Sequence, residues 1–439
     1  MLKARGVTAV AVMFLHAYRN PAHEMQAAEI LSATPGLSVS TSHEVSPEIR
    51  EYERASTTVL NALLKPVISD YLGRVQGRLK ATGIDAQLYL VQSNGGVVSP
   101  EDAARLPAKL LLSGPAGGAM AMSALARRHD ISNMVGIDMG GTSSDVSVVV
   151  DGRVGETAEG EIDGLPVRLP MIDIRTIGAG GGSLARVEAG ALRVGPESAG
   201  SAPGPACYSR GGAEPAVTDA NLALRRIDAQ AFLGGAMTLD EEAARGAVAT
   251  VADALSLPPE KTASGIIEVA NAAMANAVRL SLFEKGADPA DFTLAPFGGA
   301  GGLHACAIAA ELDIRRILFP AMASTLSAGG ILMSDLRHDL SHSGLMLAED
   351  AAVATLAEAV AALRTEGTAL LEADGIAPER QRVEISADMR YRGQAYEIST
   401  PWDAPGPIDA DTLARLVMAF HDLHSARYAF NAPGDPVEI

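Results

Sequence analysis

The chain has 439 residues, of which 48% are hydrophobic and 20% are charged, so most of it is expected to fold rather than stay disordered. Its 35 basic and 53 acidic residues give a formal net charge of -18, which argues against a protein that binds nucleic acid through phosphate contacts. The 44 glycines are clustered, and such clusters indicate tight turns or loops that approach a ligand closely.

The N-terminal segment predicts one half of an α/β unit. Residues 7–15 form a nearly continuous apolar run, typical of a strand covered on both faces, and residues 21–31 follow as a helix. Only six residues precede the run, too few for partner strands, so we expect the chain to begin inside a domain. No apolar run reaches the length needed to span a membrane.

The two cysteines, Cys207 and Cys306, form neither a disulfide framework nor a zinc pattern, which fits a reducing cytoplasm.

A long amphipathic helix is predicted next, over residues 56–79, with a kink at Pro66. A short strand at 88–91 and a helix of small residues at 116–128 follow. Strands at 134–138 and 146–150 then enclose a loop. A turn at Asp151 and Gly152 leads into a third strand, and Asp-Gly between two β-rich runs is a strong hairpin signal.

Residues 163–235 are rich in glycine, proline and short polar residues and are expected to form an irregular insertion. In this stretch, Asp173 and Arg175 either line a substrate pocket or form a plain surface salt link. The later elements are expected as a helix at 264–285 closed by Gly286, a βαβ unit at 293–319, a helix ending near 374, strands near 383–391 and 395–399, and a helix at 411–424.

The first glycine motif, residues 136–145, lies between two antiparallel strands. A P-loop or a Rossmann turn would open a helix, so neither applies. The remaining interpretation is a hairpin whose amide groups and hydroxyls wrap a phosphate, with Asp138 holding Mg²⁺ through water. Asp145, beyond the turn, either orients a water molecule or caps the turn. The alternative for the whole segment is an ordinary glycine-rich hairpin.

The second glycine motif, residues 297–304, joins a strand to a helix. Its glycines would let a nucleotide lie flat on the backbone at the helix N-terminus, and tight strand-helix packing is the alternative. An actin-like lobe carries a phosphate hairpin followed by an adenosine loop, in the order and spacing found here. For His304 a capping or packing role is favoured, and for Cys207 a structural one. His338 and His342 could share a helical face for a metal, but no carboxylate motif accompanies them.

Seven segments together resemble the hydantoinase A / 5-oxoprolinase family, and the similarity runs over essentially the whole chain. They are EIREYERASTTVLNA (48–62), LLSGPAGG (111–118), GIDMGGTSSDVSVV (136–149), TIGAGGGSLARV (176–187), PGPACYSRGG (203–212), FGGAGGLHACAIAAEL (297–312) and MRYRGQAYEI (389–398).

The resemblance implies an ATP-dependent reaction in an actin-like ATPase fold of the α/β class, in which the amide carbonyl oxygen of a hydantoin or 5-oxoproline ring is phosphorylated before water opens the ring. It implies a hydantoinase B type partner subunit. It also implies a site of catalytic Asp138 and Asp145, with Asp138 as the Mg²⁺ carboxylate, a phosphate cradle of Gly140, Gly141, Thr142 and Ser143, and an adenosine loop of Gly298, Gly299, Gly301 and Gly302.

The expected organisation has four parts. They are the remnant of an N-terminal α/β lobe (1–45), a helical connector with the start of the central domain (46–130), the actin-like ATPase lobe with the glycine- and proline-rich insertion 163–235 (131–345), and a C-terminal α/β segment (346–439). The resemblance implies a first phosphate hairpin of the form Asp-x-Gly-Gly-Thr near the N-terminus, roughly a hundred residues before the equivalent of Val7, in addition to the motif at 138–142. This chain has no such first hairpin, so the chain alone is expected to lack substrate-stimulated ATPase activity. Two alternatives stand: an acetone carboxylase type subunit, and a truncated chain that only binds nucleotide or a partner.

Overall fold

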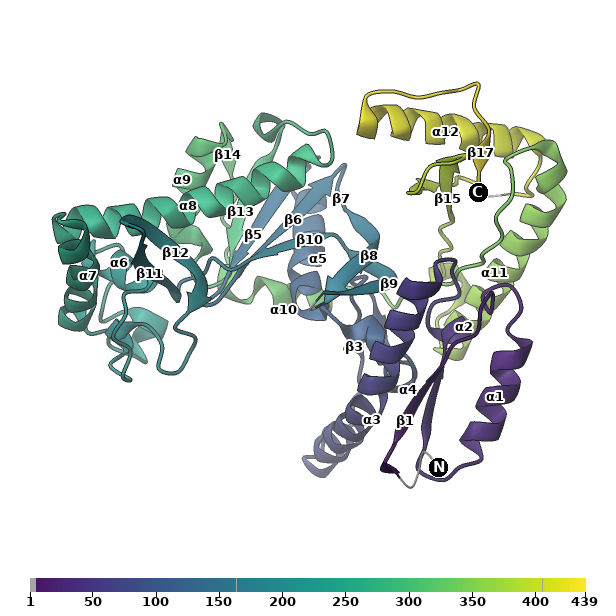
Figure 1. Ribbon diagram of the computed structural model, residues 1–439, viewed down its shortest axis with the longest axis horizontal. Coiled ribbons are helices and arrows are strands. Elements are labelled where there is room, and N and C mark those ends of the chain that lie inside the picture. Colours follow the sequence, from purple (N-terminus) through teal and green to yellow (C-terminus); the bar gives the residue numbers. More distant parts are fainter. Residues whose placement is uncertain (1–4, 163, 405) are drawn as a thin grey trace. The chain divides into compact units, whose positions relative to one another are not determined.

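The computed structural model describes residues 5–162, 164–404 and 406–439 of this α/β chain (Figure 1). These residues form two compact units that alternate along the sequence. Unit 1 comprises the chain up to Leu111, Thr157–Met171 and Asp335–Ile439, and unit 2 comprises Leu112–Glu156 and Ile172–Ser334. The ATPase lobe expected over residues 131–345 falls mostly within unit 2, and its limits stay a prediction.

Unit 2 is built on a mixed sheet with the strand order β10-β6-β5-β13-β14, and β7 pairs with the last residues of β6, Val149 and Val150. The strands are β5 (Met134–Met139), β6 (Ser144–Val150), β7 (Arg153–Val154), β10 (Ile174–Ile177), β13 (Thr293–Phe297) and β14 (Arg316–Ile317). β5 and β6 are antiparallel, which confirms the predicted hairpin, whereas β13 runs parallel to β5 and β14 parallel to β13. The turn between β6 and β7 uses positive φ angles at Asp151 and Gly152.

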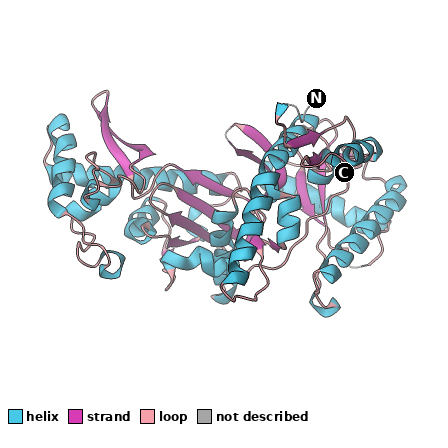
Figure 2. Cartoon of the chain, turned by 90° about the horizontal axis from the view of Figure 1, so that it is seen from below, coloured by secondary structure: helices cyan, strands magenta, loops and turns pink. Residues whose placement is uncertain are grey.

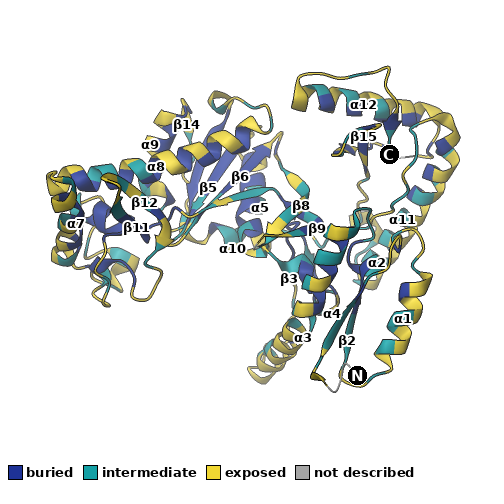
Figure 3. Cartoon of the chain, in the orientation of Figure 1, coloured by how far each residue is buried: buried dark blue, intermediate teal, exposed yellow. Residues whose placement is uncertain are grey.

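Helices cover both faces of this sheet (Figures 1 and 2). Alternate side chains of β5 point to opposite faces: Val135 and Ile137 pack with α8 (Pro259–Phe283) and α9 (Gly301–Glu311), whereas Met134 packs with α5 (Ser113–Arg128) and α10 (Leu326–Leu332). Figure 3 shows β5 and β6 as mostly buried strands. By length and composition α8 could cross a membrane, but it packs on this sheet as a core helix.

The segment expected to be an irregular insertion is largely ordered, and this expectation is corrected. It contains β9 (Leu165–Ile172), β10, a hairpin of β11 (Ser183–Glu188) and β12 (Ala191–Ser198), and α6 (Val217–Ala223), and α7 (Glu241–Leu255) follows. Some of its prolines and glycines lie within the strands themselves, Pro166 and Pro170 in β9 and Gly195 and Pro196 in β12, and these residue types hid the strand signal in the sequence.

The N-terminal part of unit 1 contains the predicted strand and helix, with one correction. β1 (Ala9–Val12) pairs in parallel with β2 (Ser38–Thr41), and α1 (Ala22–Ser32) lies between them in sequence. The strand is shorter than residues 7–15 and only half-buried, because the chain turns away after Val12 and leaves Phe14 exposed. The elements that follow are α2 (Ser42–Val45), α3 (Glu51–Ala81), β3 (Leu90–Val91), β4 (Val97–Val98) and α4 (Pro100–Arg105).

The C-terminal part of unit 1 has a core of its own. It is formed by α11 (Val353–Ala373), β15 (Ser386–Tyr391), β16 (Ile398–Pro401), α12 (Ala410–Tyr428) and β17 (Val437–Glu438), in a sheet of order β16-β15-β17. The predicted helices and strand pair of this region are confirmed.

Across both units, short 3-10 turns lie at Pro107–Leu110, Ala206–Tyr208, Phe232–Gly235, Pro289–Asp291, Ala323–Thr325, Asp350–Ala352 and Pro378–Arg380.

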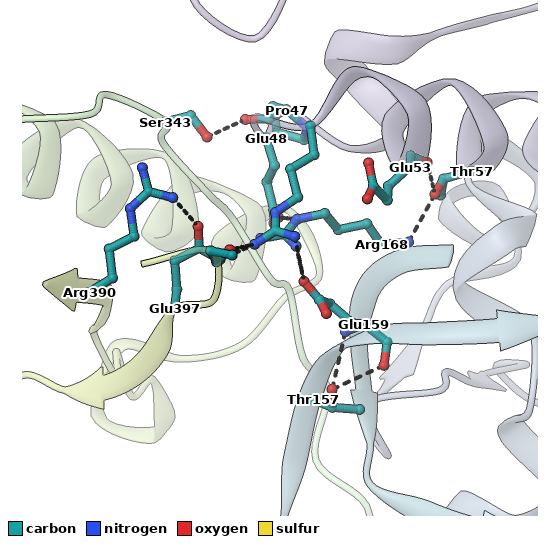
Figure 4. Close-up of polar contacts among 12 residues, drawn as sticks. Pro47, Glu48, Glu53, Thr57, Thr157, Glu159, Arg168, Ser343, Arg390 and Glu397 are labelled. Atoms are coloured by element: carbon teal, nitrogen blue, oxygen red, sulfur yellow. Dashed lines mark hydrogen bonds and ion pairs between the residues drawn. The ribbon is translucent and has the colours of Figure 1, made fainter. Parts of the chain in front are cut away.

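A network of ion pairs joins three segments of unit 1 that are far apart in sequence (Figure 4). Arg168 of β9 is buried and lies 2.6 Å from both Glu48 and Glu159, the latter on β8 (Glu156–Ile162). Arg50 lies 2.7 Å from Glu397 in the C-terminal part. Two of the family-like segments, 48–62 and 389–398, therefore meet in one charge network, and the β8-β9 segment is held to the first of them.

Candidate functional site

The two glycine motifs lie side by side at one edge of the sheet in unit 2. β5 and β13 are parallel neighbours, and Asp138 is in register with Phe297 near the end of each strand. The loops that follow them must therefore leave at the same edge. The amide of Ala300 donates to the carbonyl of Met139 at 3.0 Å, which fixes one loop against the other.

Asp138 stands between these loops. Its Oδ2 accepts a hydrogen bond from the Ser327 hydroxyl of α10 at 3.1 Å, and its Oδ1 faces Gly298. Among the described residues, Oδ1 accepts no hydrogen bond. Burial raises the pKa of the Asp138 carboxyl; the Ser327 bond partly offsets this, and the charge of Asp145 adds to it. A cation beside Oδ1 would favour the ionised form.

Asp145 pairs directly with Asp138 across the β5-β6 ladder, so both carboxylates lie on one face of the sheet. Its Oδ1 accepts a hydrogen bond from Thr176 of β10 at 2.6 Å. Burial raises the pKa of Asp145, and the Thr176 bond acts in the opposite direction. The structure thus places two partly buried carboxylates together at the turn end of the hairpin.

A third glycine-rich loop, residues 178–182, holds the phosphate hairpin. The amides of Gly181 and Gly182 donate to the carbonyls of Gly140 and Gly141 at 3.0 and 2.6 Å. A Cβ on Gly180 would lie 2.7 Å from the backbone of Thr142, so only glycine fits there. This loop lies in the segment TIGAGGGSLARV, but its partner could not be read from the sequence, because the contact is made by backbone atoms alone.

The hairpin itself presents its tip to solvent. The amide of Gly140 donates to the carbonyl of Ser143 at 3.1 Å, which closes the turn. Gly141 and Thr142 are exposed, and a Cβ on Gly141 would meet nothing within 4 Å. Two backbone amides and the two hydroxyls of this turn are therefore placed where a ligand can reach them.

The four glycines of the second loop have different surroundings. Gly298 has a φ of +76°, and a Cβ there would lie 2.6 Å from the carbonyl oxygen of Met139. Gly301 is buried against the carbonyl of Ile137. Gly299 and Gly302 are exposed, and around Gly299 there is open space. The first two glycines serve close packing, and the other two leave room at the N-terminus of α9, which no side chain caps.

His304 and Cys207 occupy structural positions. The Nδ1 of His304 lies 2.7 Å from Asn271 Oδ1, and burial lowers the pKa of His304 to about 4, with a smaller effect of Arg226. The imidazole is thus neutral at neutral pH and packed in the core. Burial, together with the nearby Asp219, raises the pKa of the Cys207 thiol, so thiolate chemistry is disfavoured.

Asp173 and Arg175 form separate ion pairs. Arg175 lies 2.5 Å from Glu284, and Lys285 donates to Asp173. Both residues therefore form salt links, the second of the two expected roles, and their partners, Glu284 and Lys285, directly follow α8.

In unit 1, His338 does not share a helical face with another histidine, because the described segment after α10 is not helical there. His338 Nε2 instead lies 2.6 Å from a carboxylate of Asp374.

A family model described as hydantoinase/oxoprolinase matches residues 54–340, and one described as the N-terminal region of hydantoinase/oxoprolinase matches residues 1–34. The chain belongs to the hydantoinase/oxoprolinase family. The sequence is 38% identical to caprolactamase subunit alpha of Pseudomonas jessenii, over 99% of this chain and 63% of that relative. It is also 38% identical to 5-oxoprolinase of Saccharomyces cerevisiae, over 76% of this chain and 27% of the relative.

Two solved structures are similar over the whole chain. The crystal structure of ATP-dependent caprolactamase from Pseudomonas jessenii aligns with a TM-score of 0.87 and 37% identity, and acetone carboxylase in its nucleotide-free form aligns with a TM-score of 0.75 and 26% identity. In both cases the alignment covers 100% of this chain and 64% of the other. This chain is therefore similar to these relatives in both sequence and three-dimensional structure. It spans less than two thirds of their length.

Proposed function

We propose that this chain supplies the nucleotide-binding lobe of an ATP-dependent enzyme that opens cyclic amides of the hydantoin or 5-oxoproline type. The observation that carries the proposal is the meeting of two glycine loops and two carboxylates at one edge of the unit 2 sheet. An actin-like ATPase lobe needs this arrangement, because the phosphates and the adenosine of one nucleotide must reach both loops.

The residues present fit ATP and Mg²⁺. Asp138 would hold the ion, since Mg²⁺ in nucleotide sites takes one or two carboxylates together with phosphate oxygens and waters. Its open Oδ1 and its raised pKa are both reasons for a cation to be favourable there. Gly140, Gly141, Thr142 and Ser143 would cradle the phosphates, and Gly298, Gly299, Gly301 and Gly302 would shape the adenosine loop. The bound ion would neutralise charge on the phosphates during transfer.

In this proposal, the chain's own side chains position the reacting groups. Ser327 holds the Asp138 carboxylate in one orientation through the bond to Oδ2. Thr176 does the same for Asp145, whose second oxygen is left to orient a water molecule. ATP would supply the phosphoryl group that activates the amide carbonyl oxygen of the ring, which makes the ring carbon open to attack by water.

The names of the relatives support the substrate class. The names caprolactamase and 5-oxoprolinase each denote an enzyme whose substrate is a cyclic amide, and both proteins are similar to this chain. A second candidate is an acetone carboxylase type subunit, which the structural similarity to acetone carboxylase favours. A third is a chain that binds only nucleotide or a partner without turnover. We further propose a hydantoinase B type partner and a cytoplasmic location, and the subunit name of the caprolactamase relative supports the partner.

The test is calorimetry of Mg-ADP binding to the full chain and to two variants. Asp138→Asn is expected to weaken binding at least tenfold, because the amide cannot replace the charge that organises the ion's water shell. Asp151→Asn is the matched control: it removes an exposed aspartate of the next turn, and it should bind like the wild type. Equal affinity for all three proteins would refute the site.

Turnover separates the candidate functions. The assay uses the chain extended by an N-terminal segment that supplies the first phosphate hairpin, together with a hydantoinase B type partner. Phosphate release that depends on a cyclic amide and matches ring-opened product then supports the proposal. ATP consumption with acetone and bicarbonate, but with no cyclic amide, would replace it by the carboxylase candidate. Nucleotide binding without either activity favours the third candidate.

A further inference from the structure

Three potential metal ligands meet in unit 1, far in sequence from the glycine loops. They are Asp102 of α4, His338, and Asp374 at the end of α11. One ligand atom from each lies within 4.8 Å of the others, and the side chains are 25%, 11% and 17% exposed. None of these residues belongs to the proposed nucleotide site, so the cluster has no role in the function proposed above.

The backbone just before His338 is fixed by hydrogen bonds to residues 92 and 97. The amide of Val97 in β4 donates to the carbonyl of Asp335, and the amide of Arg337 donates back to Val97 at 3.2 Å. The buried side chain of Gln92 donates to the carbonyl of Arg337 at 2.9 Å. The main chain that carries His338 is therefore held beside β4 by bonds that do not depend on the contact of its imidazole with a carboxylate.

A small polar cavity adjoins the cluster. Its lining includes Gln92, Asp102, Lys109 and His338, and its volume is about 20 Å³. A polar space of this size holds one water molecule or one ion. Two ligand-bearing side chains of the cluster thus face a space in which a bound ion could keep a water ligand.

We propose that Asp102, His338 and Asp374 bind one divalent transition metal ion, with Zn²⁺ or Mn²⁺ as the matching chemistry. One imidazole nitrogen with two carboxylate oxygens is a mixed N/O donor set, which suits these ions better than Mg²⁺. Three protein ligands and an adjoining water-sized cavity describe an open site rather than a closed structural one.

Two cations compete with the ion. Arg105 lies 3.1 Å from Asp102 Oδ1, but it also lies 2.9 Å from Glu44, so it has another acceptor when Asp102 turns to a metal. Lys109 lines the same cavity, and its ammonium group repels a bound ion. Replacing this lysine by an uncharged side chain of similar size should therefore strengthen metal binding.

The experiment is calorimetry of Zn²⁺, Mn²⁺ and Mg²⁺ binding to the chelator-treated full chain. One equivalent of Zn²⁺ or Mn²⁺ is expected, undisturbed by millimolar Mg²⁺. His338→Ala and Asp374→Asn should each weaken binding at least tenfold, and Lys109→Met should tighten it several-fold. His342→Ala is the matched control, since it removes a histidine four residues away that lies outside the cluster, and it should leave the affinity unchanged.

The alternative is that His338 and Asp374 form only a hydrogen-bonded pair that fastens the end of α11. No stoichiometric binding by the wild type would overturn the proposal, as would equal affinity in His338→Ala and His342→Ala. Circular dichroism checks each variant, and if His338→Ala does not fold, the nearly isosteric Asp374→Asn decides. Asp138→Asn should bind the transition metal normally, so failure here is distinguishable from failure of the proposed nucleotide site.

Discussion

Substituting Gly298 and Gly299 by alanine, one at a time, separates a glycine needed by the fold from one needed by a ligand. Gly298 has a φ of +76°, and its added Cβ would lie 2.6 Å from the carbonyl oxygen of Met139. Gly299 has no heavy atom within 4 Å of the same position. The two variants therefore differ in one methyl group at adjacent positions with opposite surroundings.

The expected destabilisation by Gly298→Ala follows from these two observations. A left-handed backbone costs an alanine about 1–2 kcal/mol relative to glycine. Overpacking against a backbone atom that cannot rotate away costs about 1–3 kcal/mol more. The free energy of unfolding should fall by about 2–5 kcal/mol. For Gly299→Ala it should change by less than about 1 kcal/mol.

Urea unfolding should be measured without nucleotide and followed by far-UV circular dichroism. Tryptophan fluorescence would report on unit 1 instead of unit 2, because the single tryptophan, Trp402, lies in unit 1. Calorimetry then compares Mg-ADP binding by wild type and Gly299→Val, which should bind at least tenfold more weakly while melting normally. Equal unfolding free energies for the two alanine variants would refute the reasoning from backbone geometry. A large loss of stability in Gly299→Val would favour packing over ligand binding.

Three further outcomes concern charged groups. Burial raises the pKa of the Asp138 carboxyl, so its ionised form opposes folding: Asp138→Asn should raise Tm at pH 7, and the gain should vanish below the unfolded value of 3.8. The pKa of His304 is about 4 when folded and 6.5 when unfolded, so wild-type stability should fall as the pH drops from 6.5 to 4, and urea midpoints of His304→Gln should not show this fall. Arg168→Met should destabilise unit 1 by about 3–5 kcal/mol, measured by tryptophan fluorescence, because it leaves Glu48 with no partner in its ion pair. An unchanged value in any of these measurements contradicts the corresponding cause.

Local patterns predicted much of the unit 2 sheet. The hairpin of β5 and β6 was predicted from two apolar strand patterns on either side of a glycine-rich loop, and the turn from β6 to β7 from Asp151 and Gly152. β13, α9 and β14 were predicted from the βαβ pattern, because strand and turn preferences act within a few residues. β2 and the β11-β12 hairpin were missed. β2 has the sequence SVST, and β12 contains both glycine and proline, so neither carries a clear strand signal without its partner.

The contacts of the candidate site could not be predicted to the same extent. Ser327 lies 189 residues after Asp138, and no local pattern indicates that its hydroxyl reaches that carboxylate. The pairing of His338 with His342 rested on a helix, and the described backbone is not helical there, so the rule that residues four apart share a face does not apply. The partner found instead, Asp374, comes from the end of a different helix.

The glycine clusters show how far composition alone can lead to a site. Three loops from separate parts of the chain meet at one sheet edge, and they approach through backbone hydrogen bonds, which side chains would prevent. Clustered glycines in the sequence therefore indicate where the site lies. They do not show which glycines the fold requires and which face a ligand. Space around the missing Cβ divides them: at Gly180 and Gly298 a Cβ would lie within 3 Å of backbone atoms, whereas Gly141 and Gly299 face open space. The first group must be glycine for the loops to meet at all, so substitutions there test the fold. Only the second group can report on a ligand, because there an added side chain displaces nothing but what binds.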